Sequence, residues 1–212
     1  MKNRVRKILC VALLLALAPV VGIQPTEAQR AVGFLPTGRD FVNQQYEDFL
    51  SRPADSGGLD HWSSLIEGGL EPSAVVEALA LSPEFEGTIA PVVRLYYAHF
   101  LRPPDYEGMT YWAQVARSGW SIQKISEEFV LSKEFVNRYG TLTNAQYVDQ
   151  LYANVLGRPA DTGGRSYWLG QLLGGVTRGE AMVAFSDSVE YRKLTGSRVL
   201  ATMLYVLSLI HI

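Results

Sequence analysis

Apolar residues recur at the spacing of one helix face in three stretches of the chain. In residues 42–50 and 148–156 they occupy the first, fifth, eighth and ninth positions, and in residues 92–100 the eighth position is His99. This spacing is typical of an amphipathic α-helix. No stretch alternates apolar and polar residues for long, so the predicted fold class is all-α, a tandem helical repeat.

His99 stands on the predicted buried face of its helix. No second histidine lies at the spacing of a metal-ligand pair. We therefore expect His99 to be a hydrogen-bonded core residue, with a metal ligand as the alternative.

The same turn follows each of the three predicted helices. A Tyr stands six residues before an Arg, and an Asp, a Gly and a Trp stand three, six and ten residues after it. The copies align without a gap from Tyr46 to Phe85, from Tyr96 to Phe135 and from Tyr152 to Tyr191. The structural turn motif is Arg52, Asp55, Gly58 and Trp62, then Arg102, Asp105, Gly108 and Trp112, then Arg158, Asp161, Gly164 and Trp168.

These copies predict three tandem repeats, residues 38–90, 91–142 and 143–195, here called the first, second and third repeat. Each is expected to hold about three helices and a short fourth. The Pro after the Arg ends the first helix, and the Asp of the motif caps the second. A Gly closes the second helix, Ser121 or Thr177 caps the third, and a Ser-x-Glu-aromatic sequence opens the fourth. Such repeats bury their faces by stacking on their neighbours.

Both ends of the chain differ from the repeats. Residues 1–28 have a basic start, an apolar run at 8–21 and a small residue, Ala28, which is the pattern of a cleaved secretory signal peptide. The alternative, a membrane anchor, needs roughly 20 apolar residues, so we expect no stable membrane span after cleavage. The only cysteine, Cys10, lies in the apolar run, so no disulfide is expected in the mature chain.

At the other end, Leu204 and Tyr205 repeat the Leu-Tyr pair of the earlier helices. We interpret residues 199–206 as the start of a truncated fourth unit. The last six residues, 207–212 (LSLIHI), match one reading frame of a transposon-end sequencing adapter, and we interpret them as a sequencing-adapter artefact.

The stretch LYANVLGRPADTGGRSYWLGQLLGG, residues 151–175, resembles the bacterial domain of unknown function 4214. The resemblance covers roughly residues 40–195. The first two repeats depart from it, since Ser51 and Leu101 replace the Gly before the Arg and His61 replaces the Tyr before the Trp. The resemblance implies an exported bacterial protein, and it brings no catalytic residues because none are established for the family.

The turn motif could bind an anion or prepare a carboxylate for catalysis, but Asp is a preferred helix cap and we expect a structural role. A calcium loop is a second option, although PADTGG lacks the several spaced oxygen side chains that Ca²⁺ needs. Zinc clusters, phosphate loops and a nucleophile turn are missing from the sequence, so neither a cofactor nor an enzyme is expected. Removing residues 1–28 changes the formal net charge from −2 to −5, which argues against nucleic acid.

The 11 Tyr and 4 Trp residues could stack on sugars, but they recur at helix-face positions and we expect most of them in the core. Trp120 lies in a loop, where we expect it to pack onto the third helix of its repeat. The sequence thus favours a secreted or cell-surface, non-catalytic helical repeat module with a structural, adhesion or protein-interaction role. An extracellular glycan- or calcium-dependent binding protein is the alternative, and an enzyme accessory domain is less favoured. The partner would be another extracellular protein or a cell-surface glycan.

Overall fold

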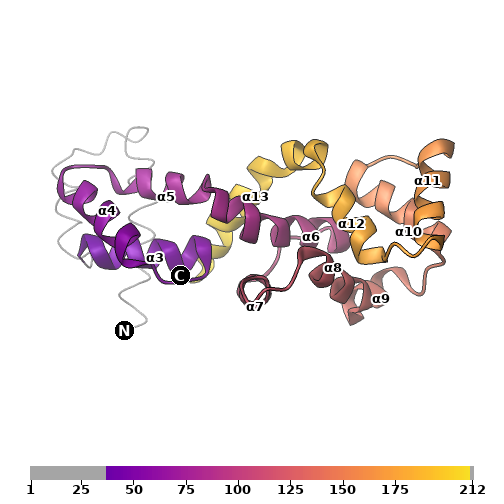
Figure 1. Cartoon of the computed structure of the whole chain (residues 1–212), viewed down its shortest axis with the longest axis horizontal. Helices are drawn as coiled ribbons and strands as arrows, with labels where there is room; N and C mark the ends of the chain where they lie inside the picture. Colours follow the sequence, from indigo (N-terminus) through magenta and orange to yellow (C-terminus); the bar gives the residue numbers. More distant parts are fainter. Residues whose placement is uncertain (1–36, 211–212) are drawn as a thin grey trace. The chain divides into compact units, whose positions relative to one another are not determined.

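The computed structural model describes residues 37–210, with side chains to residue 206, and this part of the chain is helical without a strand (Figure 1). The expectation of an all-α fold is therefore confirmed. The predicted signal peptide, residues 1–28, lies outside the described residues, as do residues 211 and 212. None of the helices in residues 37–210 is both long enough and apolar enough to cross a bilayer.

The helices follow the order that the repeats predict, but the fourth helix of the third repeat is not short as expected, since it extends over 22 residues, Val189–Ile210. The first repeat forms α3 (Gly38–Leu50), α4 (Ser56–Glu67), α5 (Pro72–Ala80) and the π-helical turn η1 (Phe85–Ile89). The second forms α6 (Ala90–Phe100), α7 (Tyr106–Arg117), α8 (Ile122–Leu131) and α9 (Lys133–Tyr139). The third forms α10 (Asn144–Leu151), which continues into the π-helical turn η2 (Tyr152–Leu156), then α11 (Thr162–Leu173), α12 (Arg178–Ser186) and α13 (Val189–Ile210).

The described chain divides into two compact units, one of residues 37–86 with 203–210 and one of residues 87–202. In the first compact unit α3 packs against α4 and α5, and the Phe49 and Phe85 rings lie 6.3 Å apart. The second compact unit holds the second and third repeats around one apolar core. The predicted start of a fourth unit, residues 199–206, lies within the long helix α13.

Local sequence explains where the second helix of each repeat begins and ends. The motif carboxylates Asp55, Asp105 and Asp161 accept the backbone N–H groups of Gly58, Gly108 and Gly164 at 2.9, 2.7 and 2.8 Å. At the other end Gly69, Gly119 and Gly175 have φ of 100, 98 and 103°, a region that favours glycine. In the first repeat the N–H of Leu70 reaches back to the carbonyl of Leu65 at 2.9 Å, the helix-closing bond of a Schellman motif. The predicted caps are confirmed.

The second and third repeats stack through their third helices, α8 and α12, which lie side by side (Figure 1). Gln123 and Gly179 hold the same place in these helices, two residues after the caps Ser121 and Thr177. A Cβ on Gly179 would lie 2.7 Å from the Gln123 carbonyl oxygen and 2.6 Å from the Glu127 nitrogen, so the backbones approach closely at this point. The third helices of the two repeats therefore pack directly against each other, and stacking is confirmed for these two repeats.

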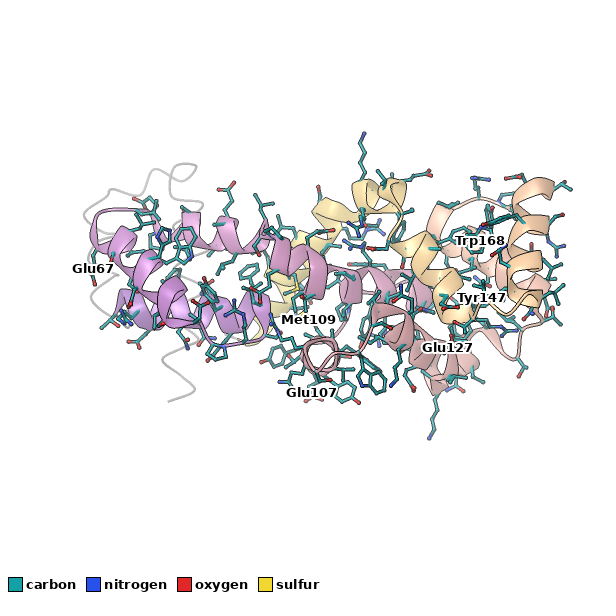
Figure 2. All side chains as sticks on the ribbon, in the orientation of Figure 1. Glu67, Glu107, Met109, Glu127, Tyr147 and Trp168 are labelled. Atoms are coloured by element: carbon teal, nitrogen blue, oxygen red, sulfur yellow. The ribbon has the colours of Figure 1, made fainter. Side chains whose placement is uncertain are left out.

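The start of α12 receives two side chains from other helices, Glu127 and Tyr147 (Figure 2). The Glu127 carboxylate accepts the Gly179 N–H at 2.5 Å, and the Tyr147 hydroxyl donates to the Arg178 carbonyl at 2.7 Å. A negative charge at a helix N-terminus is favourable, because unpaired N–H groups and the helix dipole make this end positive. Burial also raises the pKa of Tyr147, which keeps its hydroxyl protonated and able to donate.

The residue before the motif Arg ends the first helix in a left-handed conformation in every repeat. Ser51, Leu101 and Gly157 have φ of 53, 52 and 62°. Only glycine adopts this conformation without steric cost, and an L-residue there costs on the order of 1–2 kcal/mol. The departures from the family pattern at Ser51 and Leu101 are therefore strained positions.

Replacing Leu101 with Gly is expected to raise the free energy of unfolding by about 0.5–1 kcal/mol, since relief of strain exceeds the extra freedom that glycine has in the unfolded chain. Leu101 is 48% exposed, so little apolar burial is lost. Urea denaturation of the purified protein measures the change. The matched control is Gly157→Ala, which places a side chain in the same conformation and should destabilise; a destabilised Leu101→Gly variant would contradict the argument.

Candidate functional site

The Arg of the turn motif is held by a glutamate that lies far along the sequence. In the first two repeats, the Nε and Nη2 atoms of Arg52 and Arg102 each lie 2.7 Å from the carboxylate oxygens of Glu84 and Glu134. The Nη1 atoms donate to the carbonyls of Pro53 at 3.0 Å and Pro103 at 2.9 Å. Because such two-bond pairs are strong, the glutamate hydrogen bond raises the pKa of both arginines.

The sequence analysis did not identify this glutamate partner. The signal was present, because the Glu of the Ser-x-Glu-aromatic sequence stands 32 residues after the Arg in all three repeats. The Ser of that sequence caps the following turn as expected. In the first two repeats, Ser82 and Ser132 accept the N–H groups of Phe85 and Phe135, both at 3.1 Å.

The Arg–Glu ion pair of the first two repeats is here called the clasp. Within the described part of the chain, the third repeat lacks it. Arg158 lies 3.5 Å from the Asp161 carboxylate and 3.5 Å from the Pro159 carbonyl, and it forms no ion pair with Glu190. Its side chain is 53% exposed, against 27% for Arg52 and 37% for Arg102. The third copy of the turn is therefore the most open to solvent.

A tyrosine links the turn to the first helix of its repeat. The guanidinium carbons of Arg52, Arg102 and Arg158 lie 5.0, 5.3 and 5.3 Å from the ring centres of Tyr46, Tyr96 and Tyr152. The hydroxyls of these tyrosines contact the motif glycines, and a Cβ at Gly58, Gly108 or Gly164 would overlap them. Close packing therefore requires glycine at this position. Burial also raises the pKa of Tyr96 to about 12.

The motif tryptophans are half-buried in all three repeats rather than fully enclosed. Trp112 and Trp168 pack against Phe129 and Phe185, with ring centres 5.1 and 5.0 Å apart (Trp168 is labelled in Figure 2). In the first repeat Leu79 takes the position of these phenylalanines. The core role expected for the tryptophans is confirmed in the second compact unit.

An exposed ring stands beside each motif tryptophan. His61, Tyr111 and Tyr167 contact the next residue edge-on, with ring centres 5.0, 4.9 and 5.3 Å apart. Tyr111 and Tyr167 are both 59% exposed. Trp120, which was expected to pack onto the third helix, is half-buried against the core, and the Lys124 nitrogen lies 3.7 Å from its ring centre.

The turn motif can do little chemistry in this arrangement. The capping bond to the Gly58 or Gly164 N–H lowers the pKa of Asp55 and Asp161, so these carboxyls are poor proton donors at neutral pH. Among the described residues, no group of three or more His, Cys, Asp or Glu side chains could hold a metal ion. The structure brings the motif residues together within each repeat, where the Asp caps the second helix, and the Arg–Glu pair forms in the first two repeats.

His99 lies in the core of the second compact unit, with no exposed surface. Its Nε2 atom is 2.9 Å from the Ser126 hydroxyl, and Phe129 and Phe135 lie edge-on with ring centres 5.5 and 5.7 Å away. Burial lowers the pKa of His99 to about 3, so the imidazole is neutral at neutral pH. The interpretation of His99 as a hydrogen-bonded core residue is confirmed.

A family model described as a domain of unknown function (DUF4214) matches the chain at residues 23–89 and 126–195. These two segments take up more than half of the chain. Most of the second repeat lies between the two matched segments. It is assigned as a repeat because it has the same helix caps as the other two, the same Arg–Glu pair as the first and a close contact with the third. Comparisons with proteins of curated function and with solved structures find no match.

Proposed function

The chain belongs to the DUF4214 family, and from this premise we propose that it is an exported, non-catalytic helical repeat module with an adhesion, assembly or protein-interaction role. The observation that supports this proposal most strongly is the use of the repeated residues. In the first two repeats the Arg binds the Glu of its own repeat. The Asp caps a helix in every repeat. A motif whose polar groups are engaged within the fold is a folding element rather than a reaction centre.

The repeat architecture supports an interaction role in a second way. Tandem repeats present equivalent side chains at regular positions on their outer surface. Tyr111 and Tyr167 are such a pair, exposed to the same extent at the same place in two successive repeats. Exposed aromatic rings are favoured both at protein interfaces and in sugar recognition, which keeps a glycan-binding protein as the second candidate.

The export part of the proposal is tested by fractionating bacteria that express the full chain with a C-terminal tag. N-terminal sequencing of the tagged protein should find a start after Ala28 in the extracytoplasmic fraction. The control carries lysines at Leu13 and Leu14, which interrupt the apolar run, and should stay unprocessed in the cell. Unprocessed wild-type protein in the cytoplasm would refute export.

The interaction part is tested on a glycan array with the mature protein, with Ca²⁺ and with a chelator. Because we propose a protein partner, we expect no glycan signal that depends on Tyr111 and Tyr167. Binding lost in the Tyr111→Ser–Tyr167→Ser variant would establish the glycan candidate. Loss of glycan binding on chelation would establish the calcium-dependent form. Crosslinking of the exported protein to one defined envelope protein, weakened by the same variant, would support our proposal.

A further inference from the structure

A groove in the second compact unit contains hydrogen-bond donors that the fold does not use. It lies between the end of α6, the turn η2 and α13, and has a volume of about 580 Å³, within the ordinary range for small-molecule sites. Its walls carry the aliphatic side chains of Leu101, Leu156 and Leu194 and the rings of Tyr97 and Tyr191. Arg198 is the charged residue that lines it.

Tyr191 is the first of the two donors. Only 4% of the residue is exposed, and its side chain lines the groove. Its hydroxyl forms no hydrogen bond within the described residues, although its backbone N–H binds the Ser188 hydroxyl and its carbonyl accepts from Thr195. Because the hydroxyl oxygen keeps solvent access through the groove, a ligand acceptor bound there can replace water as its partner.

Arg198 is the second donor. Its guanidinium carbon lies 5.2 Å from the Tyr97 ring centre, and no carboxylate within the described residues pairs with it. The charges of Arg198 and Arg94 act on the Tyr191 hydroxyl, while burial raises the pKa of Tyr191 and keeps its proton in place. The groove therefore offers a neutral donor in a positive potential, which favours an anionic acceptor.

The other polar groups of the groove are already engaged. The Tyr97 hydroxyl lies 2.6 Å from that of Thr202, and the Asn154 amide donates to the Ala98 carbonyl at 2.8 Å and the Tyr139 hydroxyl at 3.0 Å. A sugar, with many hydroxyls, needs more free partners than this groove provides. Two donors beside an aliphatic wall suit one acidic group attached to an apolar chain.

We propose that this groove binds an apolar monocarboxylate, whose carboxylate accepts from Tyr191 and Arg198 while its chain lies against Leu101, Leu156 and Leu194. The inference goes beyond the proposed function, since it requires neither export nor a protein partner. A negative result for the proposed function therefore does not contradict the groove proposal, and a negative result for the groove does not contradict the proposed function.

The test is isothermal titration of the folded chain with decanoate below its micelle concentration. We expect saturable binding at one site. Decanol, which lacks the carboxylate, and glucuronate, which lacks the apolar chain, should bind at least about tenfold more weakly, because each loses one class of contact. Absence of saturable decanoate binding, or equal binding of decanol or glucuronate, would overturn the proposal.

Three variants locate the site. Tyr191→Phe removes only the hydroxyl, and Arg198→Gln removes the charge; each should weaken decanoate binding about tenfold. Lys193→Gln is the matched control, because it removes an exposed charge from the same helix outside the groove and should keep the wild-type affinity. Tyr191→Phe should also melt at the wild-type temperature, since its hydroxyl has no partner within the fold. Equal weakening in Lys193→Gln and Arg198→Gln would show non-specific attraction and refute the site.

Discussion

Replacing Asp187 with Leu is expected to lower the free energy of unfolding of the second compact unit by about 3 kcal/mol. Asp187 Oδ1 lies 2.7 Å from Nη2 of Arg94, whose side chain is only 2% exposed. The Asp187→Leu variant removes one of the partners of this buried guanidinium, and the loss is costly because the surrounding protein solvates the charge poorly. Breaking a buried ion pair costs about 3–5 kcal/mol. We expect the lower end of this range because the Asp187 side chain is 28% exposed.

The repeats supply the substitutions that test this pair. At the position of Asp187 the first and second repeats have Leu81 and Leu131, and at the position of Arg94 the first and third have Gln44 and Gln150. Both replacements are therefore compatible with the helices. The double variant Arg94→Gln–Asp187→Leu removes both charges together and should recover most of the lost stability.

Urea denaturation of the two single variants and the double variant gives the coupling between the charges. The matched control is Arg192→Gln, which removes the second cation bound to Asp187. The Arg192 side chain is 42% exposed, so its loss should cost less than about 1 kcal/mol. A cost for Asp187→Leu no larger than that of Arg192→Gln would show that burial of Arg94 contributes little.

The features that could be predicted from the sequence are those that a single repeat determines. The caps of the second helix, the closing glycines and the Ser-x-Glu turn depend on residues close together in the chain, and the same chemistry occurs three times. Because the motif residues recur at the same spacing in all three repeats, they could be distinguished from residues that occur there by chance. The helical boundaries and the structural role of Asp55, Asp105 and Asp161 followed from this local pattern.

Apart from the Arg–Glu pair, whose residues lie 32 positions apart, the features that could not be predicted depend on contacts that only one repeat makes. Asp187 stands where the other repeats have leucine, so no periodicity indicated its pairing with Arg94. The same holds for Glu127, which binds the N-terminus of a helix in the next repeat. The groove was not predicted either, because its walls come from three helical segments. The sequence analysis identified Tyr191 only as the aromatic residue of a Ser-x-Glu-aromatic sequence.

Acid is expected to destabilise the second compact unit through His99. Burial lowers the pKa of His99 to about 3 in the folded chain, against 6.5 for an ordinary histidine. Between these pH values the unfolded chain binds a proton that the folded chain does not, so the free energy of unfolding falls as the pH falls. The contribution of His99 is complete above pH 6.5 and decreases by about 1.4 kcal/mol per pH unit below it, or about 3 kcal/mol by pH 4.

The first repeat shows how to remove this group without leaving a cavity or an unpaired hydroxyl. It has Phe49 and Val76 at the positions of His99 and Ser126. The double variant His99→Phe–Ser126→Val therefore replaces a polar pair by an apolar pair that the same helices already accommodate. It should lose the part of the pH dependence that His99 causes, while the acid sensitivity of the carboxylates stays.

Urea denaturation at a series of pH values from 7 to 4 measures the effect as the difference between wild type and double variant. We expect the two stabilities to converge, or to cross in favour of the variant, as the pH falls, because only the wild type must exclude a proton from its core. His61→Gln, which removes an exposed histidine and leaves His99 intact, should keep the wild-type slope. Parallel curves for wild type and double variant would mean that the buried imidazole takes up its proton without loss of the fold.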